Sequence, residues 1–223
     1  MIQKIDTLKR YLDRYAEEEV AIFSKSHLLS ISYHQKYDHC LVIPACNEDF
    51  EFLSRLKKSL LAQQKLLIIV VINQPENQPD NQTPISQKLL QVATTENQLL
   101  WQNITNSGET IFRCHHFQMV QWSDTRTGIV AIDRFSGDRA ISAKQGVGLA
   151  RKIGCDIACK LIQQKILEGP WIHCSDADTH LADDYFEIPD LSEETSAILY
   201  SFIHKGKDDA ITKSYCQFWC MAS

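Results

Sequence analysis

The sequence predicts an α/β fold in which a mostly parallel sheet is flanked by helices on both faces. Residues 40–44 and 66–72 have the length and composition of buried strands, and a segment with helical spacing separates them. The second run is apolar at every position, which is typical of a parallel strand covered on both faces. Such a strand-helix-strand unit binds ligands at the carboxyl ends of its strands, so residues 44–48 and 73–76 should face one crevice.

The N-terminal segment predicts a helix packed outside this core. Apolar side chains recur there at helical spacing among charged residues, at Ile5, Leu8, Leu12 and Tyr15. Residues 30–33 suit a short additional strand. We therefore expect an N-terminal helical extension at residues 1–35 and a main domain at residues 36–223.

The middle of the chain predicts further helices and strands. Asn47 has the side chain of a helix N-cap, and apolar residues follow it at helical spacing up to Leu60. Residues 74–84 are polar and rich in proline, which predicts a mobile loop. The later predictions are one or two helices at 85–100, then strands at 111–122 and 128–135 around a turn at 123–127.

Residues 144–168 predict a helix with a glycine-rich start. Gly146 and Gly148 let a phosphate or another backbone approach, a helix N-terminus favours negative charge, and Arg151 adds a charge-assisted bond. The same pattern also fits simple helix packing, and without a third glycine it is not a dinucleotide fingerprint. This helix should lead directly into a strand at 171–174.

Two aspartates follow that predicted strand. Asp176 and Asp178 are separated by one small residue, and alternate positions of an extended segment project to the same side. Both carboxylates can therefore reach one hard divalent cation, whose remaining coordination positions water or phosphate oxygens would fill. The same residues also suit a surface turn in which Ser175 and the aspartates bond local backbone groups.

Size and charge limit the classes of function. The 223 residues, of which 44% are hydrophobic and 23% charged, are ordinary for a soluble globular domain. A net charge of −5 argues against a nucleic-acid partner but leaves small anionic substrates open. Residues 66–72 are too few to span a bilayer and residues 1–10 lack a signal-peptide core, so we expect a cytoplasmic protein without an integral membrane segment.

The chain contains 8 cysteines. Without a secretory signal, we interpret most of them as reduced, small apolar residues. Cys155 and Cys159 share their spacing with Cys216 and Cys220, whereas zinc sites more often have tighter pairs with further Cys or His ligands. A zinc site is the alternative interpretation.

Three ordered motifs resemble family 2 glycosyltransferases, the inverting nucleotide-sugar enzymes with a GT-A fold. Residues 41–48 (LVIPACNE) are similar to the first strand and Pro-x-x-Asn-Glu turn of that family. Residues 144–154 resemble its Gly-x-x-x-Ala-Arg-x-x-Gly helix start, and residues 175–179 (SDADT) resemble its metal-binding Asp-x-Asp. The order and spacing of these motifs are more specific than any one of them.

The resemblance implies a nucleoside pocket at the first two strands. Pro44, Ala45 and Glu48 would line it, with Glu48 near the ribose or the base. Asn73 stands at the end of the second strand, where the family usually has an aspartate that bonds the base. An amide also pairs with a base edge, so the preferred base is left open.

The resemblance also implies a metal-bound diphosphate. Arg151, at the helix that starts with Gly146, would lie near the diphosphate of the nucleotide-diphosphate sugar. Asp176 and Asp178 would hold Mn²⁺ or Mg²⁺ against it and neutralise charge as the nucleoside diphosphate leaves. The sugar would pass with inversion to an acceptor of unknown class, whether a glycan, a lipid-linked molecule or another compound.

No catalytic base can be assigned. An inverting transfer needs a carboxylate that takes the proton of the acceptor hydroxyl, and in the family it lies in an acidic motif well downstream of Asp-x-Asp. The residues after Asp178 contain no convincing version of that motif. We therefore expect a chain whose acceptor half is largely absent, and the alternative to an active enzyme is a non-catalytic nucleotide-sugar-binding remnant.

A nucleotidyltransferase is a third interpretation. It would need a phosphate-binding turn rich in Gly, Lys or Arg directly after the first strand, and residues 44–48 lack such a turn.

Overall fold

The computed structural model describes residues 2–24, 36–76, 83–94, 98–104, 116–122, 125–189, 192 and 195–201. The chain divides into two compact units, Met1–Phe186 and Glu187–Ser223. The described residues of the second unit form neither helix nor strand. The first unit contains the sheet, its helices and every predicted site residue.

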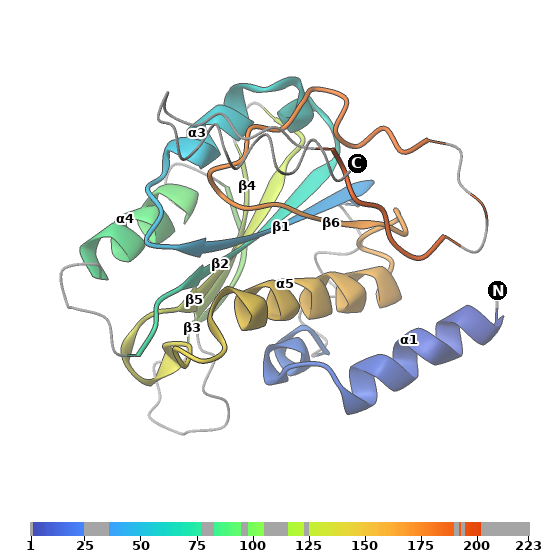
Figure 1. Cartoon of the computed structure of the whole chain (residues 1–223), viewed down its shortest axis with the longest axis horizontal. Helices are drawn as coiled ribbons and strands as arrows, with labels where there is room; N and C mark the ends of the chain where they lie inside the picture. The colour runs from blue at the N-terminus through green and yellow to red at the C-terminus, as the bar shows by residue number, and fades with distance from the viewer. Residues whose placement is uncertain are drawn as a thin grey trace, which may run out of the picture. The chain divides into compact units, whose positions relative to one another are not determined.

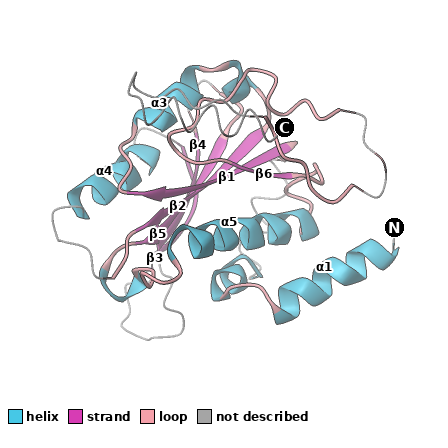
Figure 2. Cartoon of the chain, in the orientation of Figure 1, coloured by secondary structure: helices cyan, strands magenta, loops and turns pink. Residues whose placement is uncertain are grey.

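The described strands form one mixed sheet in the order β3-β4-β5-β2-β1-β6 (Figures 1 and 2). They are β1 (His39–Cys46), β2 (Leu66–Asn73), β3 (Gln98–Ile104), β4 (His116–Gln121), β5 (Gly128–Arg134) and β6 (Ile172–Cys174). The neighbours β5, β2, β1 and β6 are parallel, whereas β3 and β4 add antiparallel strands at one edge. The predicted α/β fold with a mostly parallel, Rossmann-like sheet is confirmed.

Helices cover both faces of this sheet. The described helices are α1 (Ile2–Arg14), α3 (Glu51–Lys58), α4 (Thr83–Thr94) and α5 (Gly146–Gln163), with 3-10 turns η1 (Glu18–Ser24), η3 (Leu60–Gln63) and η5 (Gly137–Arg139). One face packs on α5 and the opposite face packs on α3 and α4 (Figure 1). Every residue of β2 is buried because its side chains enter both cores in alternation, as a continuous apolar run predicts. None of the described helices has both the length and the apolarity needed to cross a membrane.

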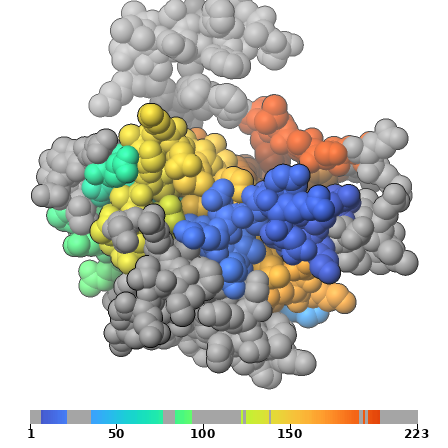
Figure 3. All heavy atoms as spheres, turned by 90° about the horizontal axis from the view of Figure 1, so that it is seen from below, coloured from blue at the N-terminus to red at the C-terminus, as the bar shows by residue number. Residues whose placement is uncertain are grey.

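The N-terminal segment lies against α5 (Figure 3). Tyr11 donates a 2.5 Å hydrogen bond to Asp156 of α5, and Lys152 bonds both Asp156 (2.7 Å) and Glu17 (2.9 Å). Val20 is buried in the same core as the inner face of α5. The predicted N-terminal helix is thus present, and the 3-10 turn after it contributes to the core. The strand predicted at 30–33 lies outside the described residues.

Two predicted helix ends are wrong. Helix α3 begins at Glu51 instead of after Asn47, whose φ of 56° places it in a left-handed turn. The N-cap position is Phe50, whose side chain caps no N–H group, and the Glu51 N–H donates to Asp49 Oδ1 at 2.8 Å. Helix α5 ends at Gln163 instead of near residue 168, because Lys165 adopts a φ of 61° and turns the chain.

Two further boundaries differ from the prediction. Residues 98–100, predicted to be helical, begin strand β3, which pairs with β4. Helix α4 begins at Thr83, inside the loop predicted at 74–84, and the centre of that loop lies outside the described residues. The strands predicted at 111–122 and 128–135 correspond to β4 and β5, although residues 111–115 are not among those described.

Candidate functional site

The carboxyl ends of the parallel strands form one edge of the sheet. Cys46 of β1 is paired with Asn73 of β2, which is paired in turn with Arg134 of β5. Strand β6 stops earlier along β1, where Cys174 is opposite Val42. The next amide, that of Ser175, donates to the Val42 carbonyl at 3.1 Å and leads the chain out along this edge.

Asp176, Ala177 and Asp178 form a turn directly after β6, which we call the carboxylate turn. Ala177 is buried in the core on the α3 face, while the aspartates on either side of it are exposed. The amide of Thr179 donates to the Asp176 carbonyl at 3.2 Å and closes the turn. Both aspartates are therefore exposed, so a cation from solvent can reach either carboxylate.

Arg151 connects α5 to the carboxylate turn. Its Nη2 donates a 2.6 Å bond to Asp176 Oδ1, and both side chains are well exposed. Exposed ion pairs of this kind contribute at most about 1 kcal/mol to stability. Arg151 thus places a positive charge beside the carboxylate that the sequence predicts to bind a metal.

Glu48 follows β1 and is electrostatically coupled to the same turn. Burial raises the pKa of its carboxyl group, and Asp178, Asp49 and Asp176 raise it further by repulsion. Arg55 acts in the opposite direction. Glu48 therefore lies near both aspartates of the turn.

The chemistry of these groups fits a hard divalent cation. Carboxylate oxygens are the ligands that Mg²⁺ and Mn²⁺ prefer, and a Mg²⁺ ion held by one or two carboxylates completes its shell with water and phosphate oxygens. No three His, Cys, Asp or Glu side chains within the described ranges are close enough to form a complete protein cage. Any cation held by the described residues would therefore have fewer than three such ligands and would complete its shell with water or phosphate oxygens.

The residues predicted to line a nucleoside pocket lie deeper. Pro44 and Ala45 are buried within β1, and Ala45 belongs to the core on the α3 face. Asn73 is only 1% exposed, and its Oδ1 has no hydrogen-bond partner among the described residues. A buried carbonyl oxygen without a donor is unusual, because its desolvation is not compensated. Asn73 is therefore an unsatisfied acceptor at the edge where the sequence predicts base recognition.

The glycine-rich start of α5 is open. Gly146 has a φ of 47°, a conformation that favours glycine, and no atom lies within 4 Å of where a Cβ would stand. The same is true of the space beside Gly148. Nothing among the described residues fills the first turn of this helix on these sides.

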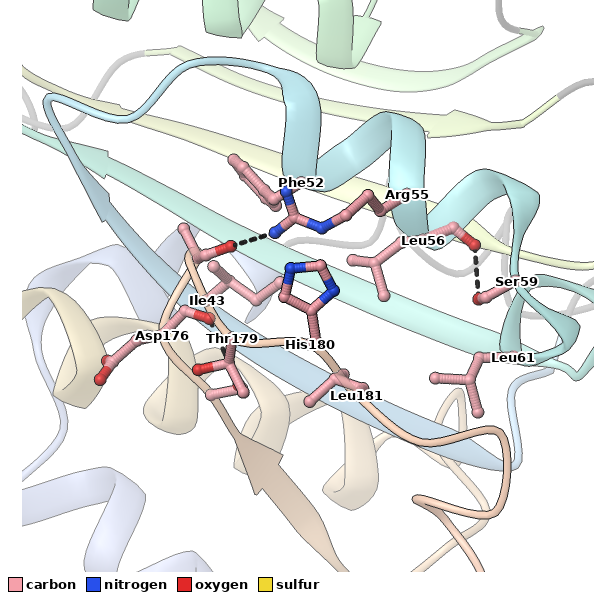
Figure 4. A pocket seen from close by; sticks show the side chains of 12 residues that line it. Ile43, Phe52, Arg55, Leu56, Ser59, Leu61, Asp176, Thr179, His180 and Leu181 are labelled. Atoms are coloured by element: carbon pink, nitrogen blue, oxygen red, sulfur yellow. Dashed lines mark hydrogen bonds between the residues drawn. The ribbon is translucent and has the colours of Figure 1, made fainter. Parts of the chain in front are cut away.

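A cavity of about 190 Å³ lies between α3 and the chain after β6 (Figure 4). Its apolar walls come from Ile43, Phe52, Leu56, Leu61, Ala177 and Leu181, and its polar groups from Arg55, Ser59, Ser175, Asp176, Thr179 and His180. Arg55 Nη2 donates a 3.1 Å bond to the carbonyl of Ala177, the central residue of the carboxylate turn. Sequence reasoning missed Arg55 and His180, because only folding brings α3 against the residues after β6.

Two cysteines adjoin the same turn. Cys155 Sγ of α5 and Cys174 Sγ of β6 lie 3.4 Å apart. The contact raises the pKa of Cys155, whereas the hydrogen bond from Cys155 lowers the pKa of Cys174. Cys40 is fully buried, as predicted for a small apolar residue, but Cys174 is exposed.

No family model, curated protein or solved structure matches the chain. The functional information therefore comes from the carboxyl edge, where Arg151 contacts Asp176 and both aspartates of the turn raise the pKa of Glu48. Pro44, Ala45 and Asn73 support the same edge from within the sheet.

Proposed function

We propose that the chain is a metal-dependent glycosyltransferase that moves a sugar from a nucleotide-diphosphate sugar to an acceptor with inversion. The observation that carries this proposal is the meeting of Glu48, Arg151, Asp176 and Asp178 at the carboxyl edge of the parallel strands. Open α/β sheets bind their ligands at this edge. If the sheet binds a nucleotide-diphosphate sugar at this edge, its fold would be of the GT-A type, in agreement with the three sequence motifs.

The diphosphate would bind between the carboxylate turn and α5. Asp176 and Asp178 would hold Mn²⁺ or Mg²⁺, which supplies charge neutralisation to the departing nucleoside diphosphate. Arg151 is within reach of the same place and would donate a charge-assisted bond to a phosphate oxygen. The first turn of α5, which is open beside Gly146 and Gly148, offers the positive end of a helix dipole, although the Gly146 N–H itself donates to the Ser142 carbonyl at 3.1 Å.

The nucleoside would bind at the ends of β1 and β2, where Glu48 follows β1 and Asn73 ends β2. Asn73 Oδ1 has no donor among the described residues, and an N–H group of a base would supply one by displacing the groups that now leave this side chain 1% exposed. Pro44 and Ala45 would support this pocket from inside the sheet without contacting solvent.

A second candidate is a protein that binds the nucleotide sugar but does not transfer it. Asp183 and Asp184 follow the carboxylate turn, are exposed, and make no hydrogen bond or ion pair with the part of the chain that the structure describes. A general base needs an orienting partner and reach to the acceptor hydroxyl. The described residues after Asp178 therefore support binding better than they support proton removal.

One assay separates these candidates. The full chain is incubated with Mn²⁺ and a panel of nucleotide sugars, and release of the nucleoside diphosphate is measured beside calorimetric titration of that diphosphate. Turnover supports the glycosyltransferase, and metal-dependent binding without turnover supports the binding protein. If neither binding nor release occurs with any donor, both proposals are wrong. Asp178→Asn should abolish the signal, and Asp184→Asn, with the same charge change nearby, should preserve it.

A further inference from the structure

Two thiols and one ion pair join the same two segments of the chain. Cys155 lies one helical turn after Arg151 on α5, and Cys174 lies two residues before Asp176. The two sulfurs are 3.4 Å apart, and Arg151 Nη2 is 2.6 Å from Asp176 Oδ1. Residues four apart on a helix share one face, so the two contacts form successive links between α5 and the carboxylate turn.

The sulfur contact is close to bonding distance. A disulfide has its sulfurs about 2.05 Å apart, so closure requires the two sulfurs to approach each other by about 1.4 Å. Cys174 is exposed and Cys155 is partly exposed, so a small oxidant reaches the pair. Cys40 is fully buried, and among the described cysteines only Cys155 and Cys174 have their sulfurs in contact.

We propose that Cys155 and Cys174 form a reversible disulfide that controls the carboxylate turn. A hydroperoxide first oxidises the sulfur of Cys174 to a sulfenic acid, and the peroxide oxygen–oxygen bond breaks to give water or an alcohol. The sulfur of Cys155 then attacks Cys174, the sulfenic oxygen leaves as water, and the sulfur–sulfur bond forms. The two thiols have lost two electrons and two protons, and a dithiol reductant restores them.

The disulfide would hold Asp176 at Arg151. The disulfide would join Cys155, one turn after Arg151, to Cys174, two residues before Asp176. It would therefore limit how far the Arg151 and Asp176 side chains can move apart. Asp176 would then be less available to a divalent cation, so oxidation would weaken cation binding. This coupling to the cation rests on the proposed function, whereas formation of the disulfide does not.

Peptide mapping tests the disulfide itself. The full chain is treated with hydrogen peroxide, alkylated without reduction and digested, and linked peptides are identified by mass spectrometry. We expect a peptide that joins Cys155 to Cys174 and disappears with dithiothreitol. In Cys155→Ser, Cys174 should instead be trapped by dimedone as a sulfenic acid, and Cys159→Ser, on the next turn of α5, should still form the link. Oxidation without this linked peptide, or linkage of Cys174 to another cysteine, would overturn the proposal.

Manganese titration tests the coupling. Mn²⁺ alone is titrated into the reduced and the oxidised chain, and we expect about fivefold weaker binding after oxidation, the scale of one exposed ion pair. Cys155→Ser should bind Mn²⁺ equally before and after peroxide. Equal affinities in the two forms of the unmodified chain would refute the coupling while the peptide map still decides the disulfide. Absence of Mn²⁺ binding even in the reduced form would instead contradict the proposed function, and the coupling with it.

Discussion

Arg151 Nη2 lies 2.6 Å from Asp176 Oδ1, so a protein cation already neutralises one of the two carboxylates of the turn. The pair is exposed and therefore weak. A divalent cation that binds Asp176 and Asp178 would displace the guanidinium, which would then be free for a phosphate oxygen. Arg151 would thus compete with the metal and cooperate with the diphosphate.

Replacing Arg151 by Ala should separate these two effects. In Arg151→Ala the guanidinium no longer competes for Asp176, so the affinity for Mn²⁺ alone should be equal to or higher than that of the unchanged chain. A nucleoside diphosphate with Mn²⁺ should bind about tenfold more weakly, because one charge-assisted hydrogen bond is lost. Calorimetry with Mn²⁺ and then with the nucleotide measures both, and a parallel weakening of the two affinities would contradict this division of roles.

Asp178→Ala should leave folding intact and abolish metal-dependent nucleotide binding. The Asp178 side chain is exposed, so its removal should change the free energy of unfolding by less than about 0.5 kcal/mol. Asp184→Ala removes an exposed carboxylate six residues away and serves as the control for net charge. Unfolding in urea gives the stability, and unchanged binding in Asp178→Ala would show that the turn is only structural.

Arg55 should position the carboxylate turn. It donates to the Ala177 carbonyl at 3.1 Å, so Arg55→Ala would release the residue between the two aspartates. We expect nucleotide binding with Mn²⁺ to weaken about fivefold, the scale of one lost hydrogen bond. Lys57→Ala removes an exposed positive charge from the same helix and should have no such effect. An equal loss of nucleotide affinity in both variants would indicate that the net charge matters and that Arg55 does not position the turn.

Gly154 should be intolerant of a methyl group. A Cβ there would stand 2.4 Å from Val42 Cγ1, so α5 would have to move away from β1. Gly154→Ala should destabilise the chain by about 1 to 3 kcal/mol, as overpacked cores do. Gly148→Ala, on the same helix with no atom within 4 Å, should stabilise it by about 0.5 to 1 kcal/mol. Urea unfolding of the two variants compares these opposite signs directly.

His173 should make stability depend on pH. Burial, followed by repulsion from His39, lowers the pKa of His173 from 6.5 to about 4. Between these values the unfolded chain binds the extra proton, so stability is fully present above pH 6.5 and falls on acidification, by up to about 1.4 kcal/mol per pH unit. His173→Phe, which can retain packing on Tyr185 and Phe186, should flatten this slope. Urea unfolding across this range is the measurement, and an unchanged slope in His173→Phe would contradict the assignment to His173.

The sequence predicted the parallel strands well because burial on both faces leaves a clear pattern. Every position of β2 had to be apolar, and the structure buries all of them. Strand β3 was missed because Leu99, Leu100 and Trp101 continue the apolar spacing of the preceding helix. Helix α5 was predicted too long because its end was placed at the stop signal Gly169-Pro170, although the chain has already turned at Lys165.

The candidate site was predictable only in part. Glu48, Asp176 and Asp178 could be placed at one edge because they follow parallel strands, and Arg151 because it lies near the start of the connecting helix. The bond from Arg55 to Ala177 and the contact between Cys155 and Cys174 depend on how helices pack on the sheet. Spacing along a chain carries no signal for such contacts between distant segments.

The carboxylate turn follows the shortest parallel pairing of the sheet. Strand β6 pairs with β1 through three residues, whereas β1 and β2 pair through eight. We expect amide protons next to so short a pairing to exchange through local opening, at a free-energy cost below that of global unfolding. A ligand that links the turn to α5 would suppress this opening. Part of the binding free energy would then be spent on keeping the edge strand β6 paired with β1.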